Sequence, residues 1–457
     1  SNDNAVIDAN AEISGDAAVG DLTINNGKSL VVDAGRLLTV GGTFVNNAQA
    51  SEFVLNEGAQ LVHNTPNVQA TVQKNITGYG SGNGNWYLVA SPFVGNMAAT
   101  PLITGEYDLY SYDESTHYWM NSKDLNSGFN TLANGTGYLY ANEADKQVVL
   151  SGELQPSNNH VDVPLSYTPS LNTLRGFNLV GNPFPCKAML MGGNIAADFY
   201  VMNDDRDELE VSQNNIINPY EGIFVEATSP ESVAQFYRWN PDYRGGESSA
   251  SFDITVNEGR NEIDRARVRM GEGVGLCKFS LNDNSAKIYI PMDKQDYASV
   301  YVSGQNVLPL NFKPAKNGTY TLNFDLANVD LTYLHLIDNL TGADVDLIGI
   351  VASTGSVSYS FDAKMTDYAS RFKLVFAEKQ QSEETDDSDF VYFADGQMFA
   401  FSTEENSVIQ IIDAAGRIVL NENVNGFVNK SLSLKSGVYV ARMICGGAVK
   451  TQKFVAE

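Results

Sequence analysis

The 457-residue sequence predicts an all-β protein made of several domains. Short apolar runs recur along the chain, and Gly, Asn, Asp or Pro soon follows each of them, as in strands joined by turns. No stretch keeps an apolar period of 3.6 residues between capping residues, so we expect no helix longer than about three turns. The expected boundaries are 1–75 for a β-solenoid-like cap, 76–160 and 161–250 for two copies of a β-module, 251–378 for a β-sandwich, 379–389 for an acidic linker and 390–457 for an Ig-like C-terminal sandwich.

A short repeat of apolar triplets predicts the first domain. Leu22, Leu30 and Leu38 follow one another at a spacing of eight residues (30 − 22 and 38 − 30), and Phe53 and Leu61 repeat that spacing. Short strands separated by Gly turns at a small fixed period are typical of a β-solenoid or a tight meander. The segment is similar to the Gly-punctuated β-solenoid segments at the start of many bacterial surface proteins, and we expect it to be a structural cap or stalk.

Two pairs of matching motifs predict the duplication. Trp86-Tyr-Leu-Val-Ala-Ser-Pro-Phe93 returns as Phe177-Asn-Leu-Val-Gly-Asn-Pro-Phe184, an offset of 91 residues (177 − 86). Gly137-Tyr-Leu-Tyr140 returns as Gly222-Ile-Phe-Val225, an offset of 85 residues (222 − 137). In each copy the first strand should end at its proline, which has no amide proton for a ladder. We therefore expect both copies to have the same strand order, with Trp86 and Phe177 in equivalent cores.

Aromatic side chains are frequent in both copies, and two interpretations apply to them. Rings at alternate positions, such as Tyr138 and Tyr140, point to one side of a strand and fill a core. Other rings stand among hydrogen-bonding residues in loop-like segments, which suits a sugar-stacking or protein-contact surface, or packing under a long loop. The candidate ligand-binding residues of this second kind are Tyr118, Trp119, Tyr237, Trp239 and Tyr243.

The third unit, 251–378, is predicted to be a β-sandwich because its apolar runs alternate or are continuous over strand lengths. Asn317-Gly318 and Asn339-Leu-Thr-Gly342 are expected to form hairpin turns. Arg265, Arg267 and Arg269 alternate, so they should share one face of a strand. We expect that face to be exposed or to form ion pairs with nearby Glu262 and Glu272.

The C-terminal segment follows a run that cannot fold alone, because Glu378 to Asp389 contains six acidic residues, one basic residue and no apolar residue. Beyond it, Val408 to Ile412 and Ile418 to Leu420 flank a turn that contains Gly416. A second hairpin is expected around Gly446-Gly447. The chain should therefore end in a small sandwich.

These C-terminal residues resemble the type A sorting domain of bacterial type IX secretion, an Ig-like module that takes cargo across the outer membrane of certain Gram-negative bacteria. The preceding sandwich also looks like the one that often comes before this domain. The resemblance implies handling by the type IX secretion machinery and a location outside the cell or on the outer-membrane surface. The motifs that carry it are Ile412-Asp-Ala-Ala-Gly-Arg417, Leu432-Ser-Leu-Lys-Ser-Gly-Val-Tyr-Val440 and Lys450 to Val455 for the sorting domain, and Ile290 to Tyr297, Leu334 to Gly342 and Tyr368 to Phe376 for the sandwich.

Composition excludes several classes of function. A formal net charge of −26, from 29 Lys and Arg against 55 Asp and Glu, makes nucleic-acid binding unfavourable. No apolar run is long enough for a transmembrane segment. The three cysteines and four histidines are scattered, so neither a metal site nor a catalytic triad is indicated. Asn203-Asp-Asp-Arg-Asp-Glu208 has Glu208 where a calcium loop needs Gly, which favours a solvated turn.

We therefore expect no catalytic residues, no cofactor and no metal, and a protein that is not an enzyme. The leading hypothesis is an exported surface protein that binds or displays a protein or matrix partner, as an adhesin does. The alternative is a carbohydrate-binding component of a polysaccharide-handling system. The two differ in whether the loop aromatics form an exposed platform for a sugar.

Overall fold

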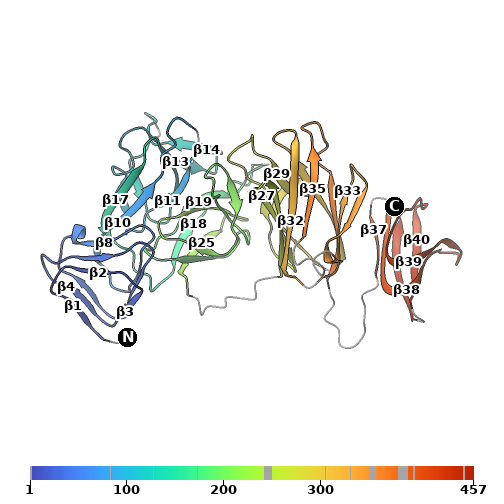
Figure 1. The fold of residues 1–457 in the computed structure, drawn as a ribbon, viewed down its shortest axis with the longest axis horizontal. Helices are drawn as coiled ribbons and strands as arrows, with labels where there is room; N and C mark the ends of the chain where they lie inside the picture. Colours follow the sequence, from blue (N-terminus) through green and yellow to red (C-terminus); the bar gives the residue numbers. More distant parts are fainter. Residues whose placement is uncertain are drawn as a thin grey trace. The chain divides into compact units, whose positions relative to one another are not determined.

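The computed structural model describes residues 3–82, 84–126, 128–171, 173–240, 250–303, 305–329, 331–349, 357–378, 390–394, 397–445 and 448–456. Within these residues the structure consists of strands β1 to β41, one 3-10 helix, η1 (Ala50–Glu52), and helical residues at 347–349, so the expected all-β class is confirmed (Figure 1). The chain forms two compact units. The first comprises Ser1–Ser249, Glu262–Arg267 and Gly273–Tyr301, and the second comprises Ala250–Asn261, Val268–Glu272 and Val302–Glu457.

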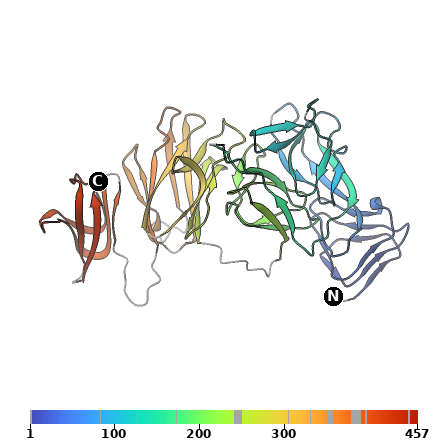
Figure 2. The same ribbon diagram turned by 180° about the vertical axis from the view of Figure 1, so that it is seen from behind.

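The first nine strands form three parallel ladders, drawn in blue in Figures 1 and 2. Each ladder takes every third strand, so strands that are neighbours in the sequence belong to different ladders. Leu22 and Ile24 are buried and Thr23 between them is not, as alternation along a strand requires. The ladders are β1 (Ala5–Ile7), β4 (Leu22–Ile24) and β7 (Phe44–Asn46); β2 (Ala11–Ile13), β5 (Leu30–Val32) and β8 (Phe53–Leu55); and β3 (Ala17–Val19), β6 (Leu37–Val40) and β9 (Gln60–Val62).

Strand β10 (Gln69–Ile76) joins these ladders to the first copy of the repeat. It runs parallel to β8 and antiparallel to β17 (Lys146–Glu153), with Val72 opposite Leu150. Both side chains are buried in one apolar core that also contains the inward residues of the ladders. The N-terminal strands and the first copy therefore share a core.

The two copies of the repeat have the same strand order, as the sequence predicts. The first sheet runs β11-β16-β13-β14 and the second runs β19-β24-β21-β22. Leu88 faces Leu139 in the first, and Leu179 faces Phe224 in the second, which are the same positions at offsets of 91 (179 − 88) and 85 (224 − 139). The strands are β11 (Tyr87–Ala90), β13 (Tyr107–Asp113), β14 (Tyr118–Asn121) and β16 (Gly137–Asn142), then β19 (Phe177–Gly181), β21 (Tyr200–Met202), β22 (Leu209–Val211) and β24 (Gly222–Glu226).

Each copy also has an outer pair of strands at matching positions. β12 (Asn96–Ala98) pairs with β15 (Thr131–Ala133), and β20 (Ala188–Met191) pairs with β23 (Ile216–Ile217). In the second copy β25 (Val233–Arg238) continues this sheet and pairs with β18 (Val161–Pro164). The repeat in sequence is therefore a repeat in topology.

The two copies contact each other through equivalent residues. Val89 of the first copy forms an isolated β-bridge with Glu221 of the second. The residues at the matching positions, Val180 and Thr136, form the same kind of bridge. The Ala90 amide donates to the Tyr220 carbonyl at 2.9 Å, and a second amide, that of Gly181, repeats this bond to the Gly135 carbonyl at 2.9 Å. Exchange of the same contacts in both directions is the property of an isologous, two-fold interface. The duplicated modules thus form an internal pseudo-dimer.

In the second unit, one group of strands has the order β34-β33-β36-β31 and another has the order β26-β32-β35. The turn at Asn339 to Gly342 joins β33 to β34, as predicted. The predicted hairpin at Asn317-Gly318 is wrong, because β31 pairs with β36 while β32 pairs with β26 and β35. The bounds are β26 (Ser251–Glu258), β31 (Gln305–Lys313), β32 (Gly318–Asn328), β33 (Leu331–Asp338), β34 (Ala343–Asp346), β35 (Val357–Ala363) and β36 (Phe372–Glu378).

Four further strands come from the predicted sandwich region: β27 (Asn261–Met270), β28 (Leu276–Cys277), β29 (Lys287–Met292) and β30 (Gln295–Val302). β28 and β29 both pair with β30. Residues 273–301 belong to the first compact unit, where Leu276 and Phe279 join the core of the repeat.

The C-terminal strands form a sheet in the order β37-β38-β40-β41, and β39 pairs with β38. The predicted turn is present, since Gly416 has φ of 77° and the Arg417 amide donates to the Asp413 carboxylate at 2.9 Å. Gly446-Gly447 and the linker 379–389 lie outside the described residues. The strands are β37 (Phe390–Ala394), β38 (Gln397–Asp413), β39 (Ile418–Ser431), β40 (Gly437–Cys445) and β41 (Ala448–Ala456).

Candidate functional site

The first predicted ligand-binding pair, Tyr118 and Trp119, lies on β14. Their side chains point to opposite faces of the sheet because they are consecutive strand residues. Tyr118 is 56% exposed. Trp119 is half-buried, with its ring 5.0 Å from the Tyr112 ring and stacked at 5.9 Å on Phe224 of the second copy. Trp119 therefore contributes to the packing between the copies, while Tyr118 is open to solvent.

The second predicted group lies on and after β25. Tyr237 is half-buried and stacks on His160, with ring centroids 5.1 Å apart. The Trp239 amide donates to the Lys187 carbonyl at 2.8 Å, and the Lys187 ammonium lies 5.8 Å from the Trp239 ring centroid. Tyr243 lies outside the described residues.

Lys187 also lines a cavity of about 350 Å³ that the sequence did not predict. Its walls come from three parts of the first unit: β9 and the turn before it, β10 with the start of β11, and β21 with nearby turns of the second copy. The lining residues are Glu57, Gly58, Gln60, Lys74, Trp86, Tyr87, Leu88, Lys187, Met202, Asn203, Asp204, Arg206, Asn218, Pro219 and Glu221.

Aromatic and charged groups meet in this cavity, which we call the repeat pocket. The Arg206 guanidinium lies 4.5 Å from the Tyr87 ring centroid, a cation–π contact, and its carbonyl accepts the Trp86 amide at 2.9 Å. Lys74 is 3.7 Å from Glu57. Three basic and three acidic side chains line the pocket, so its formal charge sums to zero.

Glu221 lines the repeat pocket, and its backbone also bridges the two copies. The Asn218 amide donates to its carboxylate at 2.9 Å. Burial raises the pKa of Glu221, and the hydrogen bonds from Asn218 and the charge of Lys74 oppose that rise. The carboxylate is therefore a hydrogen-bond acceptor at the pocket that already takes one backbone donor.

The equivalent position in the second copy is closed. Phe177, the counterpart of Trp86, is fully buried, with its ring 5.1 Å from Phe279 and 5.6 Å from Phe224. Trp86 instead makes an edge contact with Tyr110 at 6.1 Å and borders the pocket. The duplication has kept the strand order, and Trp86 packs against the same apolar core that contains Phe177. The two counterparts therefore differ in burial, because Trp86 is half-buried whereas Phe177 is fully buried.

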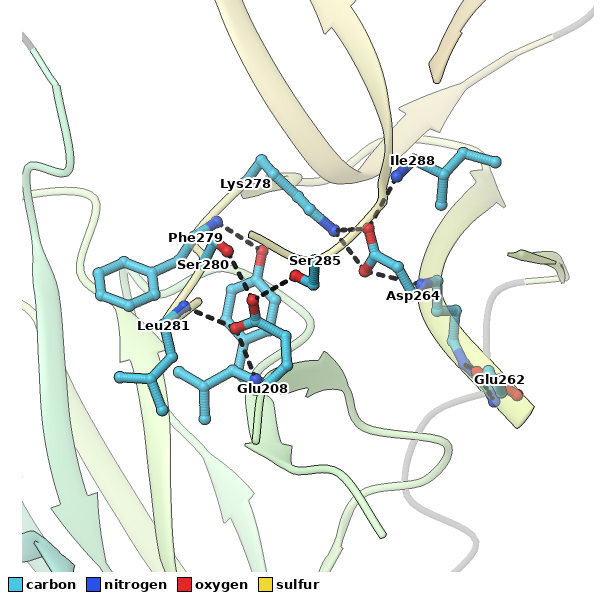
Figure 3. A network of polar contacts seen from close by, with 12 residues as sticks. Glu208, Glu262, Asp264, Lys278, Phe279, Ser280, Leu281, Ser285 and Ile288 are labelled. Atoms are coloured by element: carbon cyan, nitrogen blue, oxygen red, sulfur yellow. Dashed lines mark hydrogen bonds and ion pairs between the residues drawn. The ribbon is translucent and has the colours of Figure 1, made fainter. Parts of the chain in front are cut away.

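A polar network holds the second copy to residues 278–288 (Figure 3). Glu208 is buried, and its carboxylate accepts the Ser280 hydroxyl at 2.6 Å and the Leu281 amide at 2.6 Å. It also accepts the Asn282 amide and the Ser285 hydroxyl, both at 3.0 Å. The interpretation of this turn as solvated is therefore wrong at Glu208, because donors from residues 280–285 occupy its carboxylate.

The neighbouring carboxylate in Figure 3 belongs to Asp264, which accepts Lys278 at 2.6 Å and the Ile288 amide at 2.8 Å. On the same strand, β27, Arg265 pairs with Glu262 at 2.7 Å and Arg267 pairs with buried Asp198 at 2.6 Å. Arg265 and Arg267 are themselves buried. The prediction that this strand face is exposed is therefore wrong, and the prediction of an ion pair is confirmed for Arg265 with Glu262.

Two further observations bear on chemistry. Burial raises the pKa of Cys186 to about 12, and burial together with the Glu226 carboxylate raises the pKa of Cys277, so both thiols are protonated at neutral pH. Within the described ranges, no three His, Cys, Asp or Glu side chains are grouped to hold a metal ion. In that same part of the chain, none of the helices has the length and apolar character needed to cross a membrane.

Comparison with known proteins supplies one family. Residues 395–457 match the secretion system C-terminal sorting domain. No curated protein matches the sequence. Among solved structures the chain is similar to one described as "Biofilm associated protein - BSP domain", with 9% sequence identity and a TM-score of 0.15. That match covers 84% of this chain and 63% of the other, so this chain spans less than two thirds of its length, and a TM-score this low carries no conclusion about fold or function. The β37–β41 sheet and the family match together identify the chain as an exported surface protein that carries a type IX secretion sorting domain at residues 395–457.

Proposed function

We propose that this chain is a non-catalytic protein of the Gram-negative outer surface that binds a protein or matrix partner, as an adhesin does. The repeat pocket is the observation that carries the proposal. It joins an aromatic side chain to a balanced set of charged and amide groups within one compact unit, which is the composition of a recognition site. The sorting domain delivers the chain to the surface, and the duplicated modules make the contact.

Two further aromatic residues outside the pocket lining are part of the proposal. Tyr118 is exposed on β14, and the half-buried Trp239 ring lies 5.8 Å from the ammonium of Lys187, which lines the repeat pocket. Rings of this kind supply contact area at a small cost in side-chain entropy. A role without catalysis is supported by the protonated thiols and by Glu208 and Asp264, whose oxygens are occupied by protein donors.

The second candidate is a carbohydrate-binding component of a polysaccharide-handling system. It is favoured by the position of Trp86 beside amide and carboxylate groups, because aromatic faces and planar polar groups are the usual partners of sugar rings and hydroxyls. The two candidates differ in whether the chain promotes attachment of whole cells or capture of soluble polysaccharide.

Adherence of cells that display the full chain tests the proposal. Cells with the chain should adhere to wells coated with collagen, fibronectin or mucin more than cells without it, and added purified chain should block the difference. Cells that express a chain lacking residues 390–457 should retain it in the periplasm and not adhere. Equal adherence with and without the displayed chain on all three coatings would contradict an adhesin-like role.

A further inference from the structure

We infer that the repeat pocket binds a neutral saccharide, so that the partner of this surface protein is recognised through its glycan. This inference rests on the proposed surface-binding function and names the chemical class of its ligand. Three features of the pocket carry it: its charge balance, the groups that line it, and the difference between Trp86 and its counterpart in the second copy.

Charge balance excludes strongly ionic ligands. Lys74, Lys187 and Arg206 are matched by Glu57, Asp204 and Glu221. Two of the cations are already engaged, because Lys74 pairs with Glu57 and Arg206 lies over the Tyr87 ring. A phosphate or sulfate would have to displace these contacts, whereas a neutral ligand would not.

The lining groups match hydroxyl chemistry. Carboxylates accept hydrogen bonds, ammonium and guanidinium groups donate them, and the side-chain amides of Gln60 and Asn218 do both. The side-chain amide of Asn203 is engaged by Asp207 and by the Glu208 amide. A sugar hydroxyl is also a donor and an acceptor, so a polyol can satisfy a mixed lining of this kind. Trp86 adds an aromatic surface for the apolar C–H face of a pyranose ring.

Size agrees with a short saccharide. The cavity of about 350 Å³ is near the lower end of the range of about 300–1,000 Å³ that small-ligand sites occupy. The counterpart of Trp86, Phe177, is covered by Phe279, so the second copy presents no equivalent ring. The pseudo-dimer should therefore bind one ligand at this position rather than two.

The test uses the full purified chain on an array of neutral and acidic oligosaccharides, followed by calorimetric titration with the best neutral oligosaccharide. Asp204→Ala removes an exposed carboxylate of the pocket, and we expect it to weaken binding about tenfold or more. Asp205→Ala is the matched control, because Asp205 is also exposed and does not line the pocket. Trp86→Phe installs the residue of the second copy and should weaken binding without loss of the fold.

The outcomes separate this inference from the proposed function. Binding of neutral glycans that falls with Asp204→Ala and Trp86→Phe, but not with Asp205→Ala, supports the saccharide pocket. Binding restricted to acidic glycans, or binding that neither variant changes, overturns it. If no glycan on the array binds while displayed cells still adhere, the saccharide inference fails and the surface-binding function stands. If both glycan binding and adherence are absent, both fail.

Discussion

The carboxylate of Glu208 accepts the hydroxyl of Ser285 at 3.0 Å, across 77 residues of sequence. The same carboxylate takes three further donors from residues 280–282, so one buried side chain fixes this segment to the second copy of the repeat. Removal of the acceptor would leave these donors without partners inside the protein. The free-energy cost of such unsatisfied donors exceeds the net stabilisation that the hydrogen bonds provide.

Glu208→Ala should therefore lower the free energy of unfolding of the first unit by about 2–4 kcal/mol. Scanning calorimetry of the full chain measures it as a lower melting temperature. Asp283→Ala is the control, because Asp283 is fully exposed and its pair with Lys287 at 3.3 Å is a surface salt bridge of small value. Equal shifts for the two variants would show that Glu208 has no special structural role.

His63 makes stability depend on pH. It is fully buried, its Nδ1 is 3.0 Å from the Thr65 carbonyl, and burial lowers its pKa to about 4. In the unfolded chain the imidazole takes up a proton near pH 6.5, whereas in the folded chain it does so only near pH 4. The free energy of unfolding is therefore greatest above pH 6.5 and decreases as the pH falls towards 4. This single residue should account for about 2–3 kcal/mol between pH 7.5 and 4.5.

Urea unfolding of wild type and His63→Gln at these two pH values isolates that contribution. The glutamine variant should lose less stability on acidification than the wild type. His160→Gln, at an exposed histidine, should behave as the wild type does. An identical pH dependence for wild type and His63→Gln would mean that the buried imidazole is not what titrates.

The contact between the copies depends on the absence of a side chain at Gly181. A Cβ atom there would meet the Cβ of Ala90 and lie 2.8 Å from the Thr136 carbonyl oxygen. Gly181→Ala should therefore destabilise the first unit by about 1–3 kcal/mol through overpacking. Gly193→Ala is the matched control, since no atom lies within 4 Å of its added Cβ. A harmless Gly181→Ala would contradict the close packing of the pseudo-dimer.

Adjacent residues on β14 should respond differently to truncation. Trp119→Ala removes a ring that stacks on Phe224, and we expect a loss of about 2–4 kcal/mol in the free energy of unfolding. Tyr118→Ala removes an exposed ring and should change stability by less than about 0.5 kcal/mol. Thermal melts of the two variants decide this. A larger loss for Tyr118→Ala would reverse the assignment of the two faces.

Much of the fold follows from local sequence, because strand period and repeat offset are local properties. The offsets of 91 and 85 residues place Leu88 opposite Leu139 and Leu179 opposite Phe224 in the same register, and burial of both Tyr138 and Tyr140 was predictable from their alternation. Trp119 was harder to assign, since its partner Phe224 lies in the other copy and polar neighbours in sequence hide that contact.

The candidate site was not predictable in the same way. The walls of the repeat pocket range from Glu57 to Glu221, and they meet only because the two copies pack as a pseudo-dimer. The buried pair between Arg267 and Asp198 is likewise 69 residues apart in sequence. Strand patterns contain no information about such partners. The one sequence signal for the pocket was Trp86, because the first copy has Trp at the position where the second copy has Phe177 in an otherwise similar strand.

Adherence of cells that display the Trp86→Phe, Asp204→Ala double variant tests most directly whether the duplicated modules make the contact. The variant and the wild-type chain are compared at equal surface amounts, on whichever coating the wild type binds. We predict that adherence falls to the level of cells without the chain, while the Asp205→Ala variant adheres as the wild type does. Undiminished adherence of the double variant would place recognition elsewhere in the chain and contradict the assignment of function to the repeat pocket.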